Sequence, residues 1–133
     1  MPNTRTEPGF ALLVRTDGRF RLLDWPENDN QHLKILYAAC DCTHIDAVTV
    51  TEALTLWVDD EGMLNGAEFN APATRLYALH RPPHQPYFGQ ALFTGGTDPQ
   101  GNTLGLTADE AAHLLQMLLT LGGGHIPTQR TSD

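Results

Sequence analysis

Residues 54–77 constrain the fold more than any other part of the chain. They begin with alternating apolar and polar residues, pass through an acidic turn at residues 60–62, and end in a run that follows Asn70 and Pro72. Alternation with a period of two is typical of a β-strand with one buried face, and asparagine before a first-turn proline is typical of a helix start. The segment therefore predicts a strand followed by a helix, so the fold must contain both.

Two hairpins are predicted elsewhere in the chain. Residues 10–15 and 19–23 are β-rich runs joined by a turn that contains Asp17-Gly18, which is a strong hairpin signal because glycine accepts a positive φ. Residues 47–51 and 54–59 also alternate, and the link between them is too short for a crossover helix. We expect both pairs to be antiparallel, with Arg19 and Arg21 facing outward.

Three helices and a fifth strand complete the expected elements. Helices are predicted near residues 31–39 and 71–79, and a third is expected to start at the capping box of residues 107–110 and to be terminated by residues 122–124. A strand is predicted at residues 87–94. The order β-β-α-β-β-α-β-α indicates an α+β domain. We expect a mixed or mainly antiparallel sheet of about five strands, with the three helices largely on one face.

Length and composition favour a single domain over residues 1–133. The chain is 41% hydrophobic, and its polar ends at residues 1–8 and 125–133 are expected to be flexible tails. No apolar run approaches the roughly 20 residues that span a bilayer, and the N-terminus lacks the apolar core of a signal peptide. We therefore expect a cytoplasmic protein.

The charge balance is acidic. Sixteen carboxylate residues against 8 basic ones give a formal net charge of −8, which argues against nucleic acid as a partner. The same charge fits a basic protein partner, but it is also typical of a domain that only needs to stay soluble.

The cysteines and histidines offer one metal-site hypothesis. Cys40, Cys42, His80 and His84 could together supply the four ligands of a zinc ion. Against this, cysteines two apart lack the usual C-x-x-C spacing, and a free cysteine is often a small buried hydrophobe. We predict no metal site and no cofactor.

The acidic residues and the tryptophan of residues 54–77 have both a functional and a structural interpretation. Asp59, Asp60 and Glu61 could bind a divalent cation or share acid–base work, but acidic residues before glycine also form ordinary turns. Trp57 alternates with the apolar face of its strand, so it marks either a binding surface or a second face covered by a helix. The only serine, Ser132, lies in the C-terminal tail, and we predict no catalytic residue.

Part of the chain resembles a known family. The runs LWVDDEGMLNG, FNAPATRLY and PYFGQALFTGG look like the domain of unknown function 3846, whose members are small phage, plasmid and actinobacterial proteins. The resemblance covers residues 33–106. The matching positions are Val58, Asp59, Glu61, Gly62, Gly66, Asn70, Ala73, Thr74 and residues 87–93. It implies an accessory protein that acts by binding, and it implies no catalytic residues.

Three functions follow, in order of preference. The first is a non-enzymatic interaction with a host or defence protein in the host cytoplasm, through the acidic surface and Trp57, by a protein that could be a homo-oligomer. The second is binding of an anionic small molecule such as a nucleotide signal, held by Asn70, the helix start and Arg75 beside Trp57. The third is a metal-dependent hydrolase centred on Asp59, Asp60, Glu61 and a histidine. A polar, ligand-sized pocket between residues 54–77 and the strand at Tyr87 would favour the second, and a flat apolar patch the first.

Overall fold

A computed structural model describes residues 9–27, 29–62, 66–81 and 86–121. Its five strands form one sheet in the order β2-β1-β5-β4-β3, and every neighbouring pair is antiparallel. The elements are β1 (Gly9–Val14), β2 (Phe20–Trp25), a 3-10 turn (Asp29–Gln31), α1 (His32–Cys40), β3 (Ile45–Thr51), β4 (Leu54–Asp59), α2 (Ala71–His80), β5 (Ala91–Thr94) and α3 (Ala108–Leu121). The predicted α+β class and element order are confirmed.

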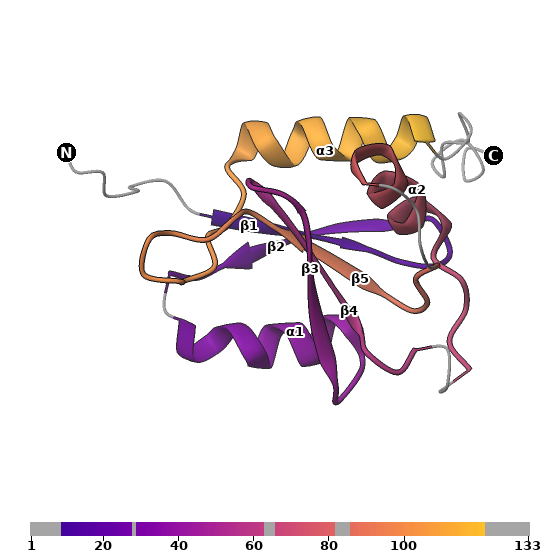
Figure 1. Cartoon of the computed structure of the whole chain (residues 1–133), viewed down its shortest axis with the longest axis horizontal. Helices are drawn as coiled ribbons and strands as arrows, with labels where there is room; N and C mark the ends of the chain where they lie inside the picture. Colours follow the sequence, from indigo (N-terminus) through magenta and orange to yellow (C-terminus); the bar gives the residue numbers. More distant parts are fainter. Residues whose placement is uncertain (1–8, 28, 63–65, 82–85, 122–133) are drawn as a thin grey trace.

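The helices lie on both faces of the sheet. Figure 1 shows α2 and α3 over one face and α1 over the other. The expectation that the helices lie largely on one face therefore holds for α2 and α3 and is wrong for α1. The connection from β2 through α1 to β3 crosses from one edge of the sheet to the other, and local sequence patterns do not specify which face such a connection takes.

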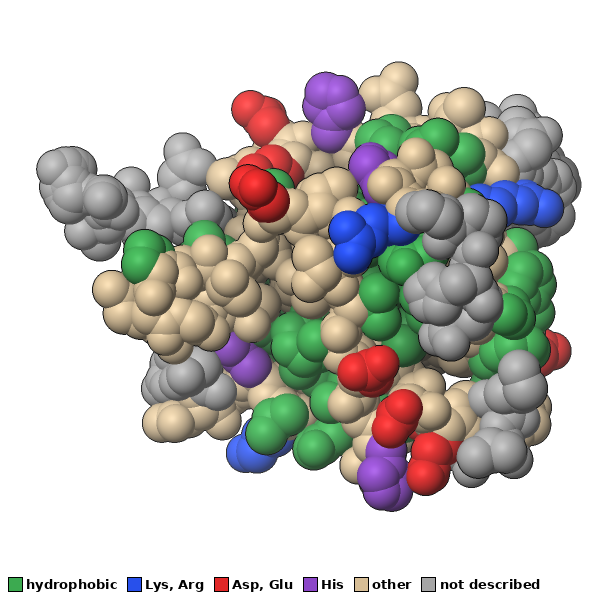
Figure 2. Space-filling model, viewed as in Figure 1, with side chains coloured by type: hydrophobic (Ala, Val, Ile, Leu, Met, Phe, Trp, Pro, Cys, Tyr) green, Lys and Arg blue, Asp and Glu red, His purple; other side chains and the backbone are tan. Residues whose placement is uncertain are grey.

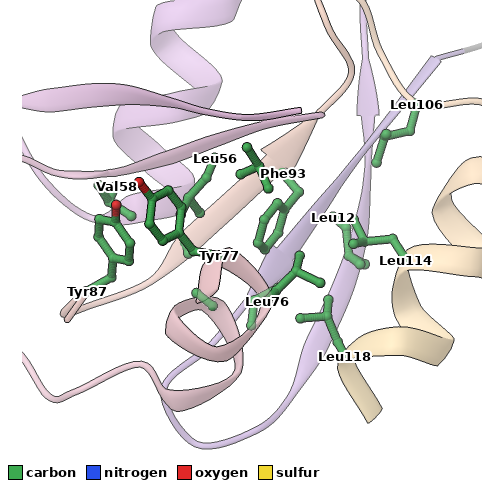
Figure 3. Close-up of a cluster of buried hydrophobic side chains, with 14 of the residues drawn as sticks. Leu12, Leu56, Val58, Leu76, Tyr77, Tyr87, Phe93, Leu106, Leu114 and Leu118 are labelled. Atoms are coloured by element: carbon green, nitrogen blue, oxygen red, sulfur yellow. The ribbon is translucent and has the colours of Figure 1, made fainter. Parts of the chain in front are cut away.

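The larger core lies between the sheet and the pair α2 and α3. Phe93 and Leu56 extend from the sheet toward Leu76 of α2 and Leu118 of α3, and all four side chains are fully buried (Figure 3). Burial of one such side chain contributes about 1.5–3 kcal/mol. The larger core therefore fixes α2 and α3 against the central strands.

A smaller core lies under α1. Leu13 of β1 and Leu92 of β5 are buried there against Leu36 and Cys40 of α1. The central strands β1 and β5 are consequently buried on both faces, which explains why their sequences are apolar runs rather than alternating ones.

Local hydrogen bonds define the helix starts. At α3, the backbone N–H of Thr107 donates to Glu110 at 2.8 Å and the N–H of Glu110 donates to the Thr107 hydroxyl at 3.1 Å, so the predicted capping box is confirmed. α1 instead follows the 3-10 turn, and the side chain at its N-cap, Gln31, makes no capping bond.

No helix in the described ranges is long and apolar enough to cross a bilayer.

Candidate functional site

The acidic turn of residues 59–61 lies at one end of the β3–β4 hairpin. Ile45 pairs with Asp59, so the start of the edge strand β3 lies beside the end of β4. The Asp59 side chain accepts the backbone N–H of Glu61 at 2.9 Å, and Glu61 lies 3.4 Å from the ring of His44. The Asp59 carboxylate thus helps to form the turn, as the structural interpretation of this segment predicts.

A small hollow opens at this end of the hairpin. Its volume is about 200 Å³, and its lining includes Asp46, Asp59, Asp60 and Phe88. Figure 2 shows carboxylate side chains around a histidine at the lower end of the face in view. The hollow lies where residues 54–77 meet the Tyr87 segment, but it is smaller than the roughly 300–1,000 Å³ of typical ligand pockets and its charge is negative.

An aromatic pair adjoins the hollow. The rings of Phe69 and Phe88 meet edge to face, with centroids 5.9 Å apart and planes at 66°, and the two residues form an isolated β-bridge. Phe69 is 46% exposed. A partner protein that covered the ring would bury this apolar surface. We call the group Asp46, Asp59, Asp60, Phe69 and Phe88 the acidic–aromatic surface. The sequence patterns did not single out Phe69. Its one distinguishing feature is that it is a large apolar residue outside both the alternating strand and the helix.

Asn70 is a structural residue in this arrangement. Its side chain is fully buried, accepts the N–H of Ala73 at 3.1 Å, and donates to the carbonyl oxygens of Val14 at 3.0 Å and Gly89 at 2.8 Å. The predicted N-cap is confirmed. The buried amide is therefore held by the fold, and a role of the α2 start in anion binding stays a prediction.

The other members of the predicted anion site lie on opposite faces of the sheet. Trp57 packs on the α1 side, where its indole N–H donates to the Thr94 hydroxyl at 2.9 Å. Arg75 lies on α2, across the sheet, and donates to the carbonyl oxygen of Leu121 at 3.1 Å. Trp57 therefore has a covering helix, as one of its two interpretations expects. The placement of Arg75 beside it is wrong, because α1 and α2 occupy different faces.

The cysteines are poor ligands and nucleophiles at neutral pH. Burial raises the pKa of the Cys40 thiol to about 12, and neighbouring Cys42 and Asp59 add to the rise. Burial and then Asp59 also raise the pKa of Cys42. His80 ends α2 on the far face, and His84 lies outside the described residues. Within the described ranges, no three His, Cys, Asp or Glu side chains form a group that could hold a metal ion.

The comparisons with known proteins give one match. The family model for the domain of unknown function DUF3846 matches residues 9–119. Neither the curated proteins nor the solved structures that were searched gave a match.

Proposed function

The chain belongs to the family described as domain of unknown function DUF3846, and we propose that it is a non-enzymatic accessory protein of a phage or mobile element. It acts in the host cytoplasm by binding a basic surface of a host or defence protein. The observation that carries this proposal is the exposed Phe69 ring beside an acid-lined hollow.

The acidic–aromatic surface has the composition of an interface centre with a charged rim. Aromatic side chains often carry much of the binding energy in interfaces, and charges around them steer a partner of opposite sign. Phe69 is already ordered by its contact with Phe88, so little side-chain entropy is lost when a partner covers it. A lysine or arginine side chain of the partner would enter the hollow between Asp46 and Asp60 while its neighbours cover the ring.

The alternatives have less support at this location. An anionic ligand would meet the carboxylates of Asp46, Asp59 and Asp60 in a hollow of only about 200 Å³. A hydrolase would need carboxylates free for chemistry, whereas Asp59 accepts a turn hydrogen bond and Glu61 faces His44. Binding of a basic protein uses the same residues without either conflict.

Edge strand β3 adds a second means of association. It is seven residues long and has β4 as its only neighbour in the described sheet, with a register shift between Thr49 and Thr51. Exposed backbone N–H and C=O groups on an edge can pair with a strand of the partner or of a second copy. Homo-oligomer formation is thus part of the proposal, and sedimentation of the purified protein measures it.

The test compares matched variants against short arginine- and lysine-rich peptides. We expect Phe69→Ser to weaken peptide binding by about 30-fold, which is the loss typical of an interface anchor. Asp60→Asn should weaken it by about threefold and reduce its dependence on salt. Calorimetric titration gives both values.

Two controls keep the result specific. Leu22→Ser removes a side chain that is 51% exposed at the other edge of the sheet, and Glu52→Gln removes an exposed carboxylate at the other end of the β3–β4 hairpin. Both variants should bind peptide like the wild type. Host proteins recovered with wild type and Leu22→Ser, but not with Phe69→Ser, are the candidate partners. Equal losses in the control variants and in Phe69→Ser would refute the proposal.

A further inference from the structure

A larger hollow lies on the α1 face, near the β2 edge. Its volume is about 540 Å³, within the range of about 300–1,000 Å³ typical of small-molecule pockets. Apolar side chains of β1, β2 and α1 form part of the wall. The polar lining consists of Arg15, Arg21, Asp24, Asp41 and Gln90.

Strand register explains why the two arginines and the glutamine meet. Arg21 pairs with Leu13, so both side chains lie on the sheet face that α1 covers. Arg15 continues β1 by donating its backbone N–H to the carbonyl oxygen of Arg19 at 2.9 Å, and alternation places its side chain on the same face as Leu13. Gln90 immediately precedes β5 and shares this face with Leu92. Three segments far apart in sequence thus converge.

The polar groups in this hollow have unused hydrogen-bonding capacity. The Oε1 atom of Gln90 is buried and accepts no hydrogen bond from residues 9–27, 29–62, 66–81 or 86–121. Neither Arg15 nor Arg21 forms an ion pair with any other part of the chain that the structure describes. A buried acceptor without a donor destabilises the folded state, and guanidinium groups in a concave, partly apolar site bind carboxylate or phosphate well.

We propose that this hollow, with Arg15, Arg21 and Gln90, binds a small anion that also carries N–H donors. The arginines hold the phosphate or carboxylate, and Gln90 accepts an N–H from the rest of the molecule. Asp24 and Asp41 oppose a ligand with many negative charges and accept further N–H groups. Nucleoside monophosphates and short peptides share this chemistry. The site is separate from the acidic–aromatic surface, so it does not depend on the proposed function.

Calorimetric titration with four probes tests the proposal. AMP and glycylglycine each combine an anion with N–H donors, whereas ribose 5-phosphate lacks the N–H and adenosine lacks the anion. We expect AMP or glycylglycine to bind, with the one that binds identifying the anion. If AMP binds, ribose 5-phosphate and adenosine should each bind at least about tenfold more weakly.

Variants assign the contacts. Arg15→Gln and Arg21→Gln should each weaken binding by about tenfold or more, since each removes a charge-assisted hydrogen bond. Gln90→Leu should weaken binding by about threefold to tenfold without lowering the thermal midpoint, because the replaced oxygen has no partner among the described residues. Arg75→Gln, which alters an exposed arginine on α2, should change nothing. The proposal fails if neither AMP nor glycylglycine binds at millimolar concentration, or if their binding survives both arginine substitutions.

Discussion

The carboxylates of Asp46 and Asp60 lie near an exposed phenylalanine at the β3 edge, whereas Arg15 and Arg21 line a ligand-sized hollow toward the β2 edge. The first region is small, acidic and aromatic, and the second is larger, with balanced charges. The net charge of the whole chain, −8, has the sign of the first region but gives no indication of the two arginines in the second. Charge must therefore be assigned to places in the fold before it can indicate a partner.

The two regions share one buried support. Asn70 follows Phe69 and donates its backbone N–H to the carbonyl oxygen of Tyr87 at 2.8 Å, which fixes the aromatic pair. Its side chain donates to the carbonyl oxygens of Val14 and Gly89, the residues just before Arg15 and Gln90. Substitutions at and around this residue can therefore separate what the regions have in common from what is particular to each.

Asn70→Ala should have the largest effect and affect both regions. The change removes the N-cap of α2 and leaves two buried carbonyl oxygens without their donor, so we expect the free energy of unfolding to fall by about 3 kcal/mol. Urea unfolding measures the loss. Asn102→Ala is the matched control, because Asn102 is exposed and its side-chain amide donates to Asp98. A loss below about 1 kcal/mol at Asn70 would show that the two regions do not share this support.

Gly62→Ala should separate the two regions. A Cβ atom at Gly62 would lie 2.7 Å from the carbonyl oxygen of Phe88, so the aromatic segment must shift. We expect a loss of about 2 kcal/mol in stability and weaker binding of basic peptide, with binding at the arginine hollow retained. Gly101→Ala is the control, since it adds backbone strain in open space at φ +88°. Equal losses of both binding activities would contradict the separation.

A pH effect at the Cys40 thiol should be the smallest over the range from about pH 9 to about pH 10. The pKa of Cys40 is raised from 9.0 to about 12 by burial, then by Cys42 and Asp59. Between these pH values the unfolded chain releases the thiol proton while the folded chain keeps it. The stability that the protonated Cys40 thiol contributes is therefore complete below pH 9 and is lost as pH rises toward 12. In this range the free energy of unfolding should fall with a slope that approaches about 1.4 kcal/mol per pH unit.

Cys40→Ala isolates this term. Its stability should fall less steeply than that of the wild type between about pH 9 and about pH 10, whatever its stability at neutral pH. Urea unfolding over this range gives the slopes, and Cys42→Ala should retain the steep component that Cys40 contributes. Parallel slopes in wild type and Cys40→Ala would show that the buried thiol titrates normally.

Sequence predicted the parts of the molecule that depend on neighbouring residues. The hairpin at Asp17-Gly18, the Asn70 cap and the capping box at Thr107 all rest on contacts within a few residues. The face that α1 covers and the position of Arg75 depend instead on how distant elements pack. Local pattern therefore gave the correct elements, but it could not show that Trp57 and Arg75 lie on opposite faces of the sheet.

The arginine hollow shows the same limit. Arg21 was expected to face outward, and it is exposed, but its relation to Arg15 and Gln90 depends on strand register. Gln90 lies far from both arginines in sequence, and the run PYFGQALFTGG that contains it does not indicate their proximity. The pairing of β1 with β2 brings Arg21 toward Arg15, and the pairing of β1 with β5 brings Gln90 toward both.

The most direct test of the account is an amide chemical-shift map of the wild-type protein, titrated with a basic peptide and, in a separate experiment, with AMP and glycylglycine. We predict two separate sets of shifted amides. The peptide should move residues 59–62, 69 and 88, whereas the small anion that binds should move residues 15, 21, 41 and 90. Shifts in one common set, or none in either titration, would contradict the claim that this protein acts through two binding regions of different chemistry.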